Sequence, residues 1–252
     1  MLSSGRKLRQ MIMGYFYDIH VHCSENSHCS PCCGRDIARA YIKAGYTGIV
    51  MTNHFLGGHQ TDLSSTDWEA EATNFLTGYL HAKEVGDREG LDVFFGWEYN
   101  YQGADLLTYG LGLDWLLAHP DMCSWDIVRY FREVHAGGGF VCHAHPFREA
   151  ANIPYIQLFP QYEDAVEVYN GSHRPGGAYD PVFNDRALWY ARQYGKLELA
   201  GSDTHGTDPE GKPSCRGTVC FDHRLSSVQE MIELFRSRSY SIGHNWEKLM
   251  RD

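Results

Sequence analysis

Two histidines one residue apart, His20 and His22, end a β-prone run that begins at Tyr15. Side chains two apart on a strand point to the same side, so both imidazoles can face one ion. An isolated His-x-His pair is more often simply exposed or hydrogen-bonded, but here similar clusters follow other predicted strands. Those clusters are Asn53-His54, Glu98, His143-Ala144-His145-Pro146 and Asp203-Thr204-His205. This recurrence indicates a metal centre.

The candidate ligands are imidazoles and carboxylates, which suit zinc, manganese or iron better than calcium. They are His20, His22, His28, His54, Glu98, His145, Asp203 and His205. Eight ligands are too many for one ion, so we expect two or three divalent transition-metal ions. Glu98 would bridge two of them, and Glu98 and Asp203 would be the catalytic carboxylates. A water held between such ions ionises near neutral pH and can attack a phosphate ester. The residues therefore predict a metal-dependent phosphoesterase acting on a small phosphorylated substrate.

Two further residues near His145 are candidates for substrate binding. Arg148 could bind a phosphoryl group through both guanidinium nitrogens, or could serve only as a salt-bridge partner. His143 would lie on the same strand face as His145, where it could contact phosphate or orient a ligand. Eight cysteines include Cys29-x-x-Cys32, but no second pair completes a four-cysteine zinc site, so we expect free thiols.

Strands alternate with helices along the chain, which favours parallel β/α units. The predicted strands cover residues 15–22, 48–52, 91–96, 106–111, 140–142, 165–169, 197–200 and 218–221. Nearly every one ends in a polar cluster, and a barrel gathers all these ends on one face, whereas an open sheet gathers ligands only at a switch point. We expect an α/β barrel in a single domain over residues 1–252, with residues 1–12 disordered or tag-like.

Charge and hydropathy exclude some classes of partner. The net charge is −10, which opposes bulk binding to nucleic acid or to a membrane surface. No apolar run approaches the roughly 20 residues of a membrane span. The N-terminal segment lacks a convincing cleavage site, and the expected location is cytoplasmic.

The polar clusters together resemble the successive motifs of the PHP (polymerase and histidinol phosphatase) family, in order over residues 15–206. The matching strings are Asp18-Ile19-His20-Val21-His22, Thr52-Asn53-His54, Gly96-Trp97-Glu98, Ala144-His145-Pro146-Phe147-Arg148, Glu167-Val168-Tyr169-Asn170 and Gly201-Ser202-Asp203-Thr204-His205. The resemblance implies a distorted seven-stranded barrel and phosphoesterase activity. It also implies a first ion on His20, His22, Glu98 and Asp203, a second on Glu98 and His145, and a third on His28, His54 and His205.

Two positions depart from the family pattern. Asn53 stands where the family usually has Asp, and residues 105–112 lack a further His, so that Asp105 could take its place or the second site could be weaker. Two other functions stay open at this point. An amidohydrolase-type hydrolase would need a lysine at a strand end, and a non-catalytic metal-binding accessory domain would need a partner. Substrate identity, including monoester or diester, and oligomeric state do not follow from the motifs.

Overall fold

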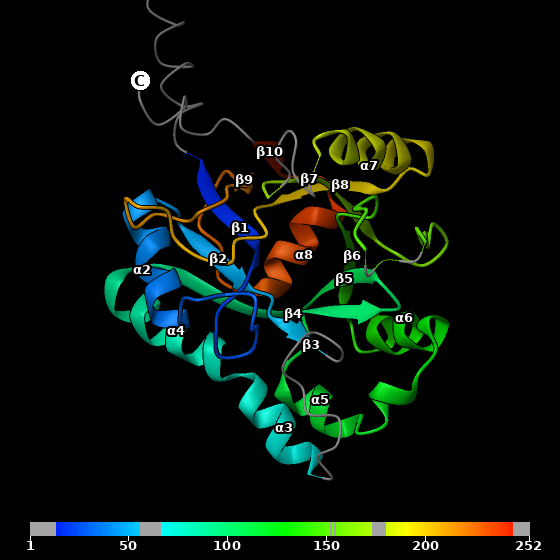
Figure 1. Ribbon diagram of the computed structural model, residues 1–252, viewed down its shortest axis with the longest axis horizontal. Helices are drawn as coiled ribbons and strands as arrows, with labels where there is room; N and C mark the ends of the chain where they lie inside the picture. The colour runs from blue at the N-terminus through cyan, green and yellow to red at the C-terminus, as the bar shows by residue number, and fades with distance from the viewer. Residues whose placement is uncertain (1–13, 56–66, 152, 154, 173–179, 244–252) are drawn as a thin grey trace, which may run out of the picture.

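The computed structural model describes residues 14–55, 67–151, 153, 155–172 and 180–243 (Figure 1). The expectation for residues 1–12 lies outside the described residues. The sequence also predicts that loops at residues 55–65, 152–162 and 172–179 determine substrate specificity, and parts of these loops lie outside the described residues as well. The strands are β1 Tyr15–Val21, β2 Gly48–Met51, β3 His54–Phe55, β4 Asp92–Tyr101, β5 Ala104–Tyr109, β6 Phe140–Ala144, β7 Ala165–Asn170, β8 Leu197–Gly201, β9 Thr218–Phe221 and β10 Ser241–Gly243. The helices are α2 Gly34–Ala44, α3 Trp68–Phe75, α4 Thr77–Glu89, α5 Leu113–Ala118, η1 Met122–Ser124, α6 Ile127–Ala136, α7 Val182–Gln193 and α8 Val228–Arg236.

The strands form one sheet in the order β10-β9-β1-β2-β4-β5-β6-β7-β8, and β3 pairs with β4 beyond the end of β2. Just past β8, Thr204 pairs with Val21 at the end of β1, and the amide of His22 donates to the carbonyl of Thr204 at 2.9 Å. This contact brings the last parallel strand back to the first and nearly closes a barrel. The predicted α/β, TIM-like barrel is therefore confirmed.

All the longer helices except α8 cover the outside of the sheet in groups (Figure 1). α2 and α4 pack side by side over β1 and β2, with Ile37, Tyr41 and Val85 in one buried cluster. α3, α5 and α6 cover β4 and β5, and α7 covers β7. α8 packs Ile232 and Phe235 against residues on the inner side of the strands. Both sheet faces are thus buried, as the apolar strand runs require.

The sheet departs from regular β/α alternation at β5, which runs antiparallel to both β4 and β6. Tyr101 and Ala104 close a tight hairpin, and the two residues between them have positive φ, 50° at Gln102 and 94° at Gly103. Two positive φ values match the twist of adjacent strands in a two-residue hairpin. The expectation of uniformly parallel strands was wrong here because Gln-Gly is a weaker turn signal than Asn-Gly.

Other local predictions also change. The sequence predicts one long helix capped by Thr66 or Asp67, but the structure divides it into α3 and α4 at Leu76, and Asp67 accepts from the amide of Ala70. The sequence also predicts Ser124 as the cap of the helix that contains Ile127, but Asp126 caps α6, because its side chain accepts from the amide of Arg129. None of the helices that the structure describes combines the length and apolarity that a membrane crossing requires.

Candidate metal centre

Glu98 lies at the centre of the converging side chains. It is in the middle of β4, 1% exposed, and flanked by Trp97 and Tyr99, which pack outward against the helices, so Glu98 faces the barrel interior. Its Oε1 is 3.3 Å from Nε2 of His20 and 3.4 Å from Nε2 of His145. Its Oε2 is 3.4 Å from Nε2 of His22 and 2.6 Å from Nδ1 of His54. One carboxylate therefore contacts four imidazoles.

Asp203 forms the second acidic contact of the cluster. Its Oδ1 lies 3.5 Å from Nε2 of His20, 3.4 Å from Nε2 of His22 and 3.5 Å from Nδ1 of His205. Asn170 and Ser172 donate to its Oδ2 at 3.3 and 3.1 Å. These donors fix the carboxylate and leave Oδ1 directed at the imidazoles.

Most of these distances fit ligands that share an ion better than ligands that bond to each other. A tetrahedral ion with bonds of about 2.1 Å separates its ligand atoms by about 3.4 Å. Among the described residues, Nε2 of His20, Nε2 of His22 and both oxygens of Glu98 are buried and make no hydrogen bond. Buried polar atoms are normally satisfied, so four such atoms meeting at one place indicate an ion.

Four overlapping groups of side chains bring three ligand atoms within 4.8 Å of one another. They are His20, His22 and Glu98; His20, His145 and Asp203; Glu98, Asp105 and His145; and His22, His54 and His205. The residues present thus fit more than one ion. Asp105, which pairs with Ala144 across β5 and β6, lies with Glu98 and His145 in one of these groups.

The imidazoles and carboxylates of the cluster shift one another's pKa values. Burial opposes ionisation of Glu98, but His54 and His20 beside it hold the pKa of that carboxyl well below its usual range. Burial likewise opposes ionisation of Asp203, and His20 and His22 outweigh it, so that its pKa is also well lowered. Burial, together with His205 and His54, lowers the pKa of His22 well below its usual value. Both carboxylates are thus charged and His22 is neutral, as metal ligands must be. Burial opposes protonation of His20 and His54, but the carboxylates beside them outweigh it and raise the pKa of both rings well above the usual value, so an ion must displace a proton from each.

The backbone supports this arrangement at two strained positions. His145 follows β6 with φ 25°, and Asp203 follows β8 with φ 54°. Positive φ is uncommon for residues other than glycine and tends to be retained where a site requires it. Close packing also requires glycine at Gly201, where a Cβ would lie 2.4 Å from Oε1 of Glu167.

The structure does not bring every predicted residue into the cluster. His28 is exposed and joins none of the four groups. Ser27 and Ser30 close a turn through a 2.9 Å backbone hydrogen bond, with residues 28 and 29 at its two central positions. The neighbouring Cys29 is also exposed and in none of the four groups, but its thiol hydrogen-bonds with the side chains of His54 and His205. Partial burial opposes ionisation of its thiol, but hydrogen bonds with His205 and His54 outweigh it and lower the pKa to about 6.

His143 and His145 do not share a face, contrary to expectation. His143 lies in register with Leu106 and Val166, both of which pack on the helix side, and its Nδ1 is 2.8 Å from Oε2 of Glu163. His145 follows the end of the strand, where its positive φ turns it toward Glu98. His143 still lines a small cavity beside His145, together with Asp105 and Arg148.

Arg148 lies at the edge of the cluster and is mostly buried. Its Nη2 donates to Oδ2 of Asp105 at 3.1 Å. The salt-bridge alternative considered from the sequence is therefore present, and it ties the guanidinium to a candidate ligand. A position beside the metal group is also compatible with contact to a phosphoryl oxygen.

Sequence reasoning assigned no ligand role to Glu167 and Asn53, which hold ligands in place. Glu167 accepts from the backbone amide of His145 at 3.0 Å and lies 2.9 Å from Nδ1 of His20. Asn53 accepts from the amide of Cys23 at 2.8 Å and donates to Sγ of Cys23 and Oδ1 of Asn26. An amide can both donate and accept, which accounts for Asn in place of the family's Asp. Both residues lie within the strings that resemble the PHP motifs, and this is the feature of the sequence that could have identified them.

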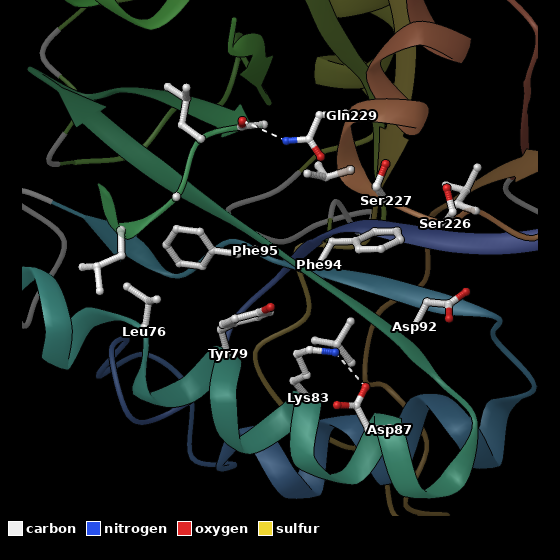
Figure 2. Close-up of a pocket in the computed structure, with 17 residues that line it drawn as sticks. Leu76, Tyr79, Lys83, Asp87, Asp92, Phe94, Phe95, Ser226, Ser227 and Gln229 are labelled. Carbon is white, nitrogen blue, oxygen red and sulfur yellow. Dashed lines mark hydrogen bonds and ion pairs between the residues drawn. The ribbon is translucent and has the colours of Figure 1, made fainter. Parts of the chain in front are cut away.

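A cavity of about 540 Å³ lies away from this cluster (Figure 2). Tyr79 and Lys83 of α4, Phe94 and Phe95 of β4, and Gln229 of α8 line it (Figure 2). It opens near the start of β4, whereas Glu98 is farther along that strand. It contains none of the clustered imidazoles or carboxylates, so its size does not make it the candidate site.

No family model matches the sequence, and no curated protein matches it. Solved structures do resemble it in fold. The chain is similar to a two-domain protein from Bacteroides vulgatus ATCC 8482 that contains a predicted PHP-like metal-dependent phosphoesterase, with 17% identity and a TM-score of 0.64. The match covers 92% of this chain and 65% of the other, so this chain spans about two thirds of that protein.

Two further structures have the same overall fold. PsfC from Pseudomonas syringae PB-5123 is 14% identical, with a TM-score of 0.58 over 94% of this chain and 95% of the other. An amidohydrolase from Chromobacterium violaceum, solved with bound sulfate and no metal, is 12% identical, with a TM-score of 0.51 over 92% and 99%. The chain thus has the barrel fold found in PHP-like metal-dependent phosphoesterases. At these identities the similarity concerns the fold.

Proposed function

We propose that this protein is a metal-dependent phosphoesterase that hydrolyses a small phosphate ester with two or three zinc, manganese or iron ions. The observation that carries the proposal is the position of Glu98, whose two buried oxygens make no hydrogen bond among the described residues and face four imidazoles. A bridging carboxylate in this position suits a cluster of ions a few ångströms apart.

The residues would divide among the ions as follows. His20, His22, Glu98 and Asp203 would hold a first ion, Glu98, Asp105 and His145 a second, and His22, His54 and His205 surround a third position. Bound there, the ions would polarise phosphoryl oxygens and lower the pKa of a water. Glu98 and Asp203, kept charged by the neighbouring imidazoles, would balance the charge of the cluster and fix the positions of its ligands.

The substrate would enter beside Arg148. Its guanidinium, held by Asp105, would direct remaining N–H donors at a phosphoryl oxygen as negative charge develops there. His143 would act in substrate binding only through the small cavity that it shares with Arg148, because its Nδ1 is engaged with Glu163.

A second candidate is an amidohydrolase-type reaction, favoured by the similarity to the Chromobacterium violaceum structure. That chemistry expects a lysine near the ions. The described lysines with hydrogen bonds or ion pairs are engaged elsewhere, Lys43 with Glu210, Lys83 with Asp87, Lys196 with Glu163 and Lys212 with Glu210. The phosphoesterase is therefore the better supported function.

The test compares hydrolysis of p-nitrophenyl phosphate, bis(p-nitrophenyl) phosphate and an N-acyl amino acid by the metal-loaded protein. The proposal expects release of p-nitrophenol from one of the first two compounds and little cleavage of the third. Cleavage of the amide alone would favour the amidohydrolase. Metal binding without any hydrolysis would favour an accessory domain.

A further inference from the structure

Three imidazoles stack at the outer side of the cluster. The ring of His22 lies 4.5 Å from that of His54 and 4.3 Å from that of His205, centroid to centroid. The three residues form a group that could hold an ion. Three imidazoles leave a fourth position on a tetrahedral ion, which a water or a side chain from the loop that follows His22 would occupy.

The loop supplies a thiol at this position. His28 and Cys29 occupy the centre of one turn, both are exposed, and neither belongs to the four ligand groups. The thiol of Cys29, however, hydrogen-bonds with the side chains of both His54 and His205.

The turn itself is anchored to the metal-binding strands. Oγ of Ser27 accepts from the amide of His54 at 3.2 Å and donates to Oδ1 of Asn53 at 3.2 Å. Beyond the turn, the amide of Ser24 donates to the carbonyl of Cys32 at 2.8 Å. These bonds hold Cys29 against the end of β2, and the position of its thiol follows from the fold.

We propose that Cys29, and not His28, is the loop ligand of the outer ion, completing a site with His54 and His205. The assignment deepens the proposed function, since it concerns an ion of the same cluster. A thiolate is softer than an imidazole or a carboxylate, and it favours zinc or iron over manganese at this position. The outer site would then differ in metal preference from the carboxylate-rich sites around Glu98.

Cobalt substitution of the full-length protein tests the ligand directly, because thiolate-bound Co²⁺ has a charge-transfer absorption in the near ultraviolet that imidazole and carboxylate sites lack. Wild type and His28→Ala should show this band and equal metal content. Cys29→Ser should lose the band and about one metal equivalent per chain. Cys32→Ser, in the same loop, is the matched control and should keep both.

Three results would overturn the assignment: a band that persists in Cys29→Ser, a band lost in His28→Ala, or a band lost in Cys32→Ser. If Cys29→Ser does not fold, iodoacetamide labelling of the wild type tests whether Cys29 binds the ion. Loading with zinc should protect Cys29 and leave Cys32 reactive, and equal labelling of Cys29 with and without zinc would contradict the assignment. A wild type that shows the band but hydrolyses no phosphate ester would refute the proposed function and leave this assignment standing.

Discussion

Nδ1 of His20 lies 2.9 Å from Oε1 of Glu167, and both side chains are fully buried. A carboxylate can only accept, so Nδ1 of His20 carries a proton, which leaves Nε2 as the ring atom available to an ion beside Glu98 and Asp203. The other oxygen of Glu167 accepts from the amide of His145 at 3.0 Å. One carboxylate on β7 thus sets the tautomer of one candidate ligand and the backbone of another.

Replacing this carboxylate should weaken metal binding without removing a ligand. In Glu167→Gln the side chain keeps only one accepting oxygen for two donors, Nδ1 of His20 and the amide of His145. We therefore expect metal affinity to fall about 10- to 100-fold. Competition with a chromophoric chelator measures the effect. Glu163→Gln is the matched control, because Glu163 is as buried but pairs with His143 on the helix side. Equal losses in both variants would mean that general destabilisation, not orientation of His20, is responsible.

Removing Glu98 should affect more than one ion. Glu98 belongs to two ligand groups, which share its two oxygens. Glu98→Gln should therefore lower metal content by more than one equivalent per chain. His20→Ala should also lower metal content, and activity should fall with it. Elemental analysis after gel filtration measures the content. Full metal content in Glu98→Gln would show that Glu98 is not the bridge.

Arg148 provides a separate test of substrate recognition. Arg148→Ala should lower kcat/KM about tenfold to a thousandfold, roughly 1.4 to 4 kcal/mol, through loss of charge-assisted contacts in the transition state. Arg148→Lys should recover only part of the lost kcat/KM, because an ammonium lacks the planar pair of donors. Metal content should be unchanged in both. Wild-type hydrolysis by the alanine variant would exclude the contact, and loss of an ion would assign Arg148 to positioning Asp105.

The start of α8 carries a pH-dependent contribution to stability. Glu230 accepts from the amide and hydroxyl of Ser226 and lies 2.9 Å from Nε2 of His223, and these contacts lower its pKa to about 2. Because the folded pKa is below the unfolded value of about 4.5, the stabilisation is present above that pH and is lost as pH falls toward 2.

Thermal unfolding of the metal-free protein measures this contribution. Glu230→Gln should melt a few degrees below wild type near pH 5, and the difference should disappear as pH approaches 2. Glu233→Gln, on the exposed side of the same helix, should cause no comparable loss. A difference that stays constant with pH would show that the charge of Glu230 is not involved.

Most of the barrel and the centre of the site could be predicted because polar residues at strand ends carry a strong local signal. His22 and Asp203 follow the ends of β1 and β8, and the direction of these strands fixes where the side chains meet. Glu98 follows the apolar run at the start of β4, but this strand continues to Tyr101, beyond the predicted end at residue 96. The antiparallel β5 was missed because two residues with positive φ, and not an apolar pattern, reverse the chain there. Motif spacing selected His28, whereas the adjacent Cys29 hydrogen-bonds with His54 and His205. Spacing counts residues but does not determine which side of a turn each one faces.

Metal content and activity measured on one preparation test the central claim most directly. Protein purified after metal-replete growth should contain at least two transition-metal ions per chain and hydrolyse a p-nitrophenyl phosphate ester. A chelator should abolish the activity, and added zinc, manganese or iron should restore it. Less than one equivalent of metal, or hydrolysis that survives complete removal of metal, would contradict the claim that Glu98 and its four imidazoles form a catalytic metal centre.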